Sequence, residues 1–436
     1  MVHFWSKVYN IIFLPLYYLS ARILSLFNQK IKQSINARSG LFKYLESKLK
    51  AIDNNKNNIL IHCASLGEFE QAKPIIDQLD KTRNYNFIVS FYSPSGFNHS
   101  RLDTALNSKI IKTYLPFDTK TNVERFVDMV NPSVAIFIKY DLWFNLVRYL
   151  KEKNIFSIVV NKNYEAKKLK WRFPLTRSYK KTVLKMLDLI AVTDDDDKKA
   201  FETILERKEG IEVFGDTKYE RIAKAKEAQS GNELLTNELV EGKNVFVVGS
   251  SWDKDEEIIL PVVEKISSNG LSDEIALITI IAPHEPTEEV LENIEYEIRT
   301  NYPLLKSIRY SEISKYTDEN VILIDCIGIL MGLYKYAKVA YVGGAFQNGM
   351  HNVLEPAGYG IPVLFGNDKI SEEGMHLLQT GGGIAVNETK DLYRNLVTLL
   401  KKPDVRMIIG KNSLSVFDSK NEASKRISEL ITKMLN

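Results

Sequence analysis

A carboxylate follows an apolar run in the segment His62–Glu70, HCASLGEFE. Ser65 is a suitable helix N-cap, Gly67 permits close backbone approach, and Glu68 falls in the first turn of the expected helix. A partly buried glutamate at such a place can act as a general base that removes a proton from an alcohol. Alternatively, Glu68 only complements the helix dipole, which contributes about 0.3–1 kcal/mol. The residue types alone leave both interpretations open.

A second candidate site is the glycine-rich segment Gly343–Gly366, GGAFQNGMHNVLEPAGYGIPVLFG. Gly343 and Gly344 allow the backbone to approach a ligand closely, and free amides at a helix starting near Asn352 suit a phosphate. Glu355 lies three residues after Asn352 and therefore on the same side of that helix, where its carboxylate can accept from ribose hydroxyls. The alternative for Glu355 is a capping-box glutamate.

Loops after other expected strands carry further polar groups. The segment FYSPSG at 91–96 offers hydroxyls and amides to a carboxylate or phosphate, while Lys162, with Lys139 after a neighbouring strand, favours an anionic substrate. His284 can frame a base or be an ordinary polar loop residue. The candidate residues in these loops are Ser93, Ser95, Gly96 and Lys162 in the first half of the chain, and Ser250, Pro283, His284, Gly328 and Ile329 in the second half.

Short apolar runs alternate with amphipathic stretches along most of the 436 residues. Runs of this kind, buried on both faces, indicate parallel sheets covered by helices, and the length suits two domains. The sequence therefore predicts an α/β fold with two doubly wound, Rossmann-like domains, whose ligands bind beyond the carboxyl ends of the strands. The expected divisions are an N-terminal segment at 1–28, a first domain at 29–214, a polar linker at 215–244 and a second domain at 245–436.

The N-terminal segment is basic and apolar. Residues 1–50 contain eight Lys or Arg and one acidic residue, around an uncharged stretch of fourteen residues, Val8–Ala21. Fourteen residues are fewer than the roughly 20 that cross a bilayer. Aromatic residues in the run and lysines behind it suit a segment that lies on an anionic membrane surface. The alternative is a buried first helix with a basic solvent face.

Several classes of site are not expected. A net charge of +3 over this length does not indicate nucleic-acid binding, and the two cysteines, Cys63 and Cys326, lie far apart. The six histidines lack the spacing of a zinc site, so we expect no metal and no cofactor. Neither a GxxxxGK[ST] nor a GxGxxG motif is present.

Several motifs together resemble those of the transferases of 3-deoxy-D-manno-octulosonic acid (Kdo). The glycine-rich segment resembles their nucleotide-binding signature, and HCASLGEFE resembles their first-domain loop. Further matches in family order are LPFDT at 115–119, DLWFN at 141–145, VVNKN at 159–163, VFGDTKYER at 213–221 and APHEP at 282–286. The sequence departs from the common family pattern at Lys139, at Lys162 and in Pro283–Pro286.

The resemblance implies a GT-B architecture, in which two Rossmann-like domains face a central cleft, and an inverting, metal-independent transfer of Kdo from CMP-Kdo to a lipid A precursor. In lipopolysaccharide biosynthesis this reaction belongs to the cytoplasmic face of the bacterial inner membrane. The resemblance makes Glu68 the base, assigns the CMP phosphate to amides near His351 and Asn352 with help from Lys218, and places ribose on Glu355.

Two alternatives remain at the level of sequence. One is another GT-B enzyme, a transferase or epimerase that uses a UDP-sugar. The other is a membrane-anchored nucleotide-binding protein without catalytic activity.

Overall fold

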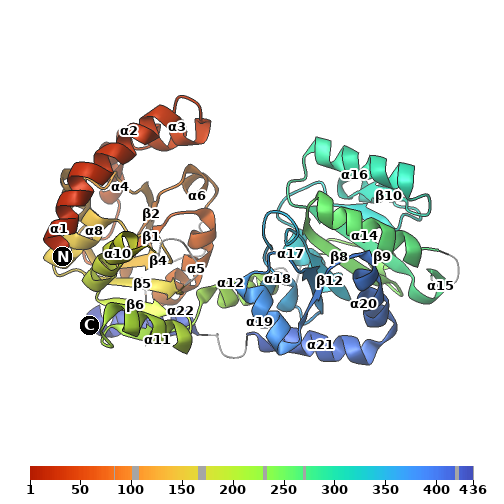
Figure 1. Ribbon diagram of the computed structural model, residues 1–436. Coiled ribbons are helices and arrows are strands. Elements are labelled where there is room, and N and C mark those ends of the chain that lie inside the picture. The colour runs from red at the N-terminus through yellow and green to blue at the C-terminus, as the bar shows by residue number, and fades with distance from the viewer. Residues whose placement is uncertain are drawn as a thin grey trace. The chain divides into compact units, whose positions relative to one another are not determined.

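The computed structural model describes residues 1–82, 84–100, 108–164, 173–228, 233–268, 272–417 and 422–435. The chain divides into two compact units (Figure 1). Unit 1 comprises Met1–Arg221 with Lys420–Asn436, and unit 2 comprises Ile222–Ser419. Each unit is built around its own parallel sheet.

The sheet of unit 1 has seven parallel strands in the order β3-β2-β1-β4-β5-β6-β7. The order reverses between β1 and β4, and the carboxyl ends of strands at such a switch point form the usual ligand site of open α/β sheets. The strands are β1 (Asn57–Cys63), β2 (Tyr85–Phe91), β3 (Ile110–Tyr114), β4 (Pro132–Ile138), β5 (Phe156–Lys162), β6 (Leu189–Val192) and β7 (Ile211–Val213).

Helices cover both faces of this sheet, with one apolar cluster on each face. The face that carries Phe69 and Ile75 of α5 also receives Ile427 and Ile431 of the C-terminal helix α22. The helices after the N-terminal segment are α3 (Gln29–Asn36), α4 (Leu41–Leu49), α5 (Leu66–Asp80), α6 (Pro94–His99), α7 (Lys120–Val130), α8 (Phe144–Glu152), α10 (Pro174–Met186), α11 (Asp195–Leu205), α12 (Thr217–Ala228) and α22 (Ala423–Leu435).

The N-terminal segment forms the helical elements α1 (Val2–Val8), η1 (Tyr9–Phe13) and α2 (Leu14–Leu24). One side is anchored on unit 1, where Trp5, Tyr9 and Leu14 join the core cluster. Asn10 and the buried Asn145 exchange side-chain amide hydrogen bonds of 3.1 and 2.8 Å. The opposite side exposes large apolar side chains: Phe4, Ile11, Ile12, Phe13, Leu16, Leu19, Ile23 and Leu24. Among the described helices, none combines the length and the apolar character needed to cross a membrane.

Unit 2 also has a seven-stranded parallel sheet, in the order β10-β11-β9-β8-β12-β13-β14. Its switch point lies between β8 and β12. The strands are β8 (Asn244–Ser251), β9 (Leu277–Pro283), β10 (Ser307–Arg309), β11 (Val321–Leu323), β12 (Val339–Val342), β13 (Val363–Gly366) and β14 (Gly383–Val386).

Apolar clusters again fill both faces of this sheet. The helices are α13 (Asn237–Val240), α14 (Asp253–Ile266), α15 (Ser272–Ile275), α16 (Glu288–Asn301), η2 (Tyr310–Lys315), α17 (Leu330–Leu333), η3 (Tyr334–Tyr336), α18 (Leu354–Ala357), α19 (Glu372–Thr380), α20 (Thr389–Lys401) and α21 (Pro403–Ser415).

The prediction of an α/β fold with two Rossmann-like units is confirmed. The C-terminal end differs from the expected division, because α22, blue in Figure 1, lies among the elements of unit 1 and packs on α5. The expected linker at 215–244 includes a helix, α12, within which the division falls, and its residues 229–232 lie outside the described residues.

Candidate active site

Glu68 lies directly beyond β1, at the switch point of the unit 1 sheet. Ser65 caps α5 by accepting from the Glu68 amide at 3.3 Å, and the Glu68 carboxylate accepts from the Ala64 amide at 2.5 Å. Burial raises the pKa of the Glu68 carboxyl, while the Ala64 amide, His62 and Lys139 act in the opposite direction. The expected N-cap and first-turn positions are therefore present, and the carboxylate is partly buried rather than solvated.

His62 and Asp141, which the sequence reasoning did not select, meet beside this loop. His62 is 1% exposed, and its Nε2 lies 2.9 Å from Asp141 Oδ2 while its Nδ1 lies 2.9 Å from Ser90 Oγ. The only sequence signal for this pair was that His62 lies near the end of one apolar run and Asp141 shortly after another, β1 and β4, which are neighbours in the sheet.

The loop after β2 packs against the loop after β1. The Ser93 amide donates to the Ala64 carbonyl at 3.0 Å, and Ser93 Oγ lies 3.2 Å from Ser95 Oγ. A Cβ at Gly96 would lie 2.8 Å from Phe91 Cδ1 and 3.2 Å from the Ser65 carbonyl carbon, so any side chain there would have to displace the Phe91 ring. The structure thus brings Ser93, Ser95 and Gly96 next to Ser65, with Gly67 exposed at the start of α5.

Lys162 reaches the loop after β4 rather than pointing into solvent. Its Nζ donates to the Lys139 carbonyl at 3.0 Å and lies 4.7 Å from the centre of the Tyr140 ring. Lys139 itself has a positive φ of 61°, which fixes the turn after β4. Lys218, the other expected cation, lies in the first turn of α12, where its amide donates to Asp216 at 2.9 Å.

In unit 2, the buried carboxylate of Asp255 holds the double-glycine turn. Asp255 Oδ2 accepts from the amides of Gly344 and Trp252 at 2.8 and 3.0 Å, and Oδ1 accepts from the Tyr341 hydroxyl at 2.8 Å. A Cβ at Gly343 would lie 2.5 Å from the Ser250 carbonyl oxygen. The glycines thus permit close packing of two loops, in addition to any approach of a ligand.

Three rings from separate strand ends stack beside this turn. The rings of His284 and His351 have centroids 4.2 Å apart, and those of Trp252 and His284 lie 4.9 Å apart. Trp252 Nε1 donates to His351 Nε2 at 2.9 Å. Burial lowers the pKa of His351, and the neighbouring His284 lowers it further. Pro283, at the end of β9, is buried, whereas His284 is exposed.

Asn352 and Glu355 lie together at the start of the short helix α18. The Asn352 side-chain amide donates to Glu355 Oε1 at 2.9 Å, and its carbonyl oxygen accepts from the Leu354 amide at 3.2 Å. Among the described residues, the backbone amides of Asn352 and Val353 donate to no protein acceptor, whereas the His351 amide donates to the Gly343 carbonyl at 3.2 Å. The amides of Asn352 and Val353 are therefore the candidate donors to a phosphate in this loop.

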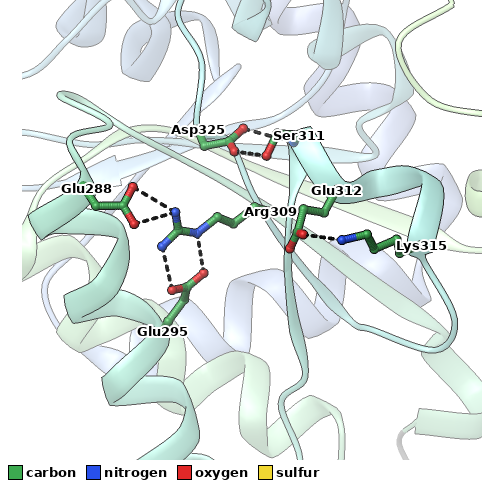
Figure 2. Close-up of polar contacts among 7 residues, drawn as sticks. All are labelled: Glu288, Glu295, Arg309, Ser311, Glu312, Lys315 and Asp325. Atoms are coloured by element: carbon green, nitrogen blue, oxygen red, sulfur yellow. Dashed lines mark hydrogen bonds and ion pairs between the residues drawn. The ribbon is translucent and has the colours of Figure 1, made fainter.

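The loop after β11 carries Gly328 and Ile329. Asp325 fixes its start, because its carboxylate accepts from the Ser311 amide at 3.1 Å and from the Ser311 hydroxyl (Figure 2). Gly328 is exposed with a φ of 99°, and Ile329 caps α17.

The neighbouring edge strand β10 is held by Arg309. Figure 2 shows its guanidinium between Glu288 and Glu295 of α16, to which it donates at 2.7–3.0 Å. These contacts fasten the edge of the sheet from which the loop with Gly328 emerges.

The strand ends of each unit offer different chemistry. Unit 1 presents a partly buried carboxylate with a raised pKa, and unit 2 presents glycine turns, stacked rings, amides and a second carboxylate. Among the residues that the structure describes, no group of three or more His, Cys, Asp or Glu is arranged to hold a metal ion. Such a set suits proton removal in unit 1 and nucleotide binding in unit 2.

Known proteins resemble this chain along most of its length. Residues 33–221 match the family model described as 3-deoxy-D-manno-octulosonic-acid transferase (kdotransferase). A 3-deoxy-D-manno-octulosonic acid transferase of Haemophilus influenzae is 26% identical over 388 residues, which cover 86% of this chain and 87% of the relative. A transferase of the same description from Rickettsia bellii is 24% identical and covers 97% of both chains.

A solved structure extends the likeness in fold to both units. The UDP-GlcNAc 2-epimerase of Methanocaldococcus jannaschii has a TM-score of 0.60 at 14% identity and covers 87% of this chain and 99% of its own. The fold and these relatives define a glycosyltransferase of GT-B type. Within that class, the chain is similar to the Kdo transferases along most of its length, and residues 33–221 match the model of that family.

Proposed function

We propose that this protein transfers Kdo from CMP-Kdo to a sugar hydroxyl of a lipid A precursor of the lipid IVA type, as a step in lipopolysaccharide synthesis. The observation that carries the proposal is the position of Glu68, a partly buried carboxylate at the switch point of unit 1. The transfer is inverting and needs no metal.

In the reaction, Glu68 takes the proton of the acceptor hydroxyl. The oxygen then forms a bond to the anomeric carbon of Kdo while the bond from that carbon to the phosphate oxygen breaks, and CMP leaves with the electron pair. A single displacement inverts the anomeric centre. The raised pKa of Glu68 brings it nearer to neutral pH, where a general base is most effective.

We assign donor binding to unit 2. The amides of Asn352 and Val353 and the ring of His351 receive the phosphate. Glu355 receives the ribose hydroxyls, since a carboxylate is a suitable acceptor for hydroxyl groups and Asn352 holds its Oε1 in place. Ser250, Pro283, His284, Gly328 and Ile329 complete the donor site, with the double glycine at 343 and 344.

We assign the acceptor and the transferred Kdo to the loops with Ser65, Gly67, Ser93, Ser95, Gly96 and Lys162. The exposed apolar side of α1, η1 and α2 supports peripheral binding to the cytoplasmic face of the inner membrane, where a lipid acceptor is found. Replacing Ile12 and Leu16 by Glu should release the protein from vesicles that contain anionic lipids, while its unfolding transition stays unchanged. Undiminished vesicle binding would contradict this assignment.

The test is transfer by the purified protein from CMP-Kdo to a lipid A precursor, with products identified by mass. Glu68→Gln should reduce kcat by about 10²–10⁴-fold, because a general base is worth that factor. Glu70→Gln, two residues further along α5, is the matched control and should retain activity. Wild-type activity in Glu68→Gln would exclude Glu68 as the base.

Nucleotide choice distinguishes this proposal from a UDP-sugar enzyme. CMP at 100 times its Kd should stabilise the protein by about 2.7 kcal/mol, whereas UDP should have little effect. Selective stabilisation by UDP would overturn the CMP assignment.

A further inference from the structure

Trp252, His284 and His351 follow three different strands, β8, β9 and β12, and their rings form one stack. The interplanar angle between the histidine rings is 19°, and between the rings of Trp252 and His351 it is 10°. The contact from Trp252 to His351 is in addition a hydrogen bond, from indole Nε1 to imidazole Nε2. The chemistry of this hydrogen bond determines which ring nitrogen of His351 carries the hydrogen.

An indole N–H is only a donor, so the imidazole nitrogen that it meets must present a lone pair. His351 Nε2 is therefore unprotonated, and a neutral ring then carries its hydrogen on Nδ1. Protonating Nε2 would set two N–H groups against each other. Burial of the ring and its contact with His284, the titratable side chain stacked on it, also favour the neutral form.

The ring is oriented as well as fixed in one tautomer. A Cβ at Gly344 would lie 2.8 Å from His351 Cδ2 and 3.0 Å from Nε2, so this edge of the ring is closed by the double-glycine turn. Nδ1 lies on the other side of the ring, and among the described residues it has no hydrogen-bond partner in the protein. An N–H at this position is thus available to a ligand, in the residue that precedes the amides of Asn352 and Val353.

We propose that Trp252 is a positioning residue, which holds His351 in the neutral Nδ1–H tautomer and directs this N–H to the anionic phosphate of the donor nucleotide. The first part concerns the protein alone. The second part rests on the proposed function, because it requires that unit 2 binds CMP-Kdo.

The first experiment is ¹⁵N NMR of the full-length protein labelled at histidine, without ligand at pH 7. The His351 signals are assigned by their loss in His351→Gln. Nε2 should show the shift of an unprotonated nitrogen and Nδ1 that of an N–H. Trp252→Phe keeps an aromatic ring but removes the donor, and should move His351 towards the Nε2–H tautomer.

Trp143→Phe is the matched control. It makes the same substitution at an indole whose Nε1 has no hydrogen-bond partner among the residues that the structure describes, and it should leave the His351 signals unchanged. A protonated Nε2 in the wild-type protein, or an unchanged tautomer in Trp252→Phe, would overturn the first part of the proposal.

The second experiment is calorimetric titration of CMP into the same proteins. Trp252→Phe should raise the Kd by about tenfold, the loss of roughly one hydrogen bond to a charged group. If CMP binds the wild type and the variant equally, the phosphate role of His351 is wrong. If CMP binds neither protein, the proposed function fails, while the tautomer result is judged on the NMR alone.

Discussion

Removing the side chain of Asp255 tests whether this carboxylate maintains the double-glycine turn. Asp255 is 1% exposed and accepts from the amides of Trp252 and Gly344 and from the hydroxyl of Tyr341. A buried donor left without an acceptor costs about 1–3 kcal/mol. With three donors left unpaired, Asp255→Ala should destabilise unit 2 by about 4 kcal/mol. This is less than the upper limit for three donors, because the Tyr341 hydroxyl can rotate to another acceptor.

Asp255→Asn should be far milder. Its carbonyl oxygen can accept from both amides, and its NH₂ group can donate to the Tyr341 oxygen, since a hydroxyl also accepts. Burial raises the pKa of the Asp255 carboxyl, so a neutral side chain also avoids the cost of desolvating a charge. We expect a loss of about 1 kcal/mol or less for a hydrogen-bonded neutral replacement.

The assay is hydrogen exchange of the β8 and β12 peptides together with urea unfolding. Asp253→Ala is the control, because Asp253 is exposed in the same first turn and contributes only about 0.3–1 kcal/mol through the helix dipole. The reasoning is refuted if Asp255→Ala costs no more than Asp253→Ala, or if the Ala and Asn variants are equally unstable.

Three further changes test other parts of the molecule. Burial raises the pKa of the Glu256 carboxyl to about 7, so the stability that its protonated form contributes is fully present below the ordinary pKa of glutamate and is lost as pH rises towards 7. Glu256→Gln should remove about 3 kcal/mol of this pH dependence, and a variant whose urea unfolding differs between pH 5 and 7.5 as much as that of the wild type would contradict it. Arg309→Lys replaces the paired hydrogen bonds to Glu288 and Glu295 with single ones, and it should cost about 1 kcal/mol of stability in urea unfolding at this partly exposed site. Lys315→Ala is the control, because the exposed ion pair of Lys315 with Glu312 should contribute little. Gly96→Ala should push the Phe91 ring aside and lower kcat through the Ser65 loop, so wild-type kinetics would refute this role.

The central strands and the loops after them were predictable because their residues are apolar throughout and end in glycine, serine or charged residues. The edge strands β7, β10 and β14 were not predicted. Two of them have only three residues, Ile211–Val213 and Ser307–Arg309, and partly exposed positions give them no continuous apolar run. The pairing that makes them strands comes from the neighbouring strand and not from their own composition.

The position of α22 depended on contacts that sequence periodicity does not encode. Its apolar side chains at 427 and 431 predict a buried face, but not the unit that buries it. A proline inside a helix removes a backbone hydrogen bond, yet α5 runs from Leu66 to Asp80 with Pro74 within it. The burial of Pro74 with Phe69 and Ile75 against the sheet offsets the missing hydrogen bond.

In the candidate site, too, some residues were predictable from local sequence and others depended on distant contacts. Glu68 and the double glycine were recognisable because each lies in a segment that follows an apolar run typical of a strand. Asp255 and Trp252 did not stand out, since one resembles an ordinary first-turn acid and the other an isolated aromatic residue. Their roles depend on a turn about 90 residues further along the chain, which the sheet brings beside them through the pairing of β8 with β12.

The stability of a Glu68 variant distinguishes the two interpretations of this residue, as a helix cap or as a base. A glutamate that only caps a helix has a lowered pKa and adds stability at neutral pH. Here burial raises the pKa, so the charged form is less favourable in the folded protein than in the unfolded chain, and the stabilising contribution is lost as pH rises through the folded pKa. Glu68→Gln keeps an acceptor for the Ala64 amide and removes the charge, and it should leave stability at pH 7.5 unchanged or slightly increased. A clear loss of stability in urea unfolding would favour the capping role, whereas loss of transfer with intact stability assigns the carboxylate to the chemistry.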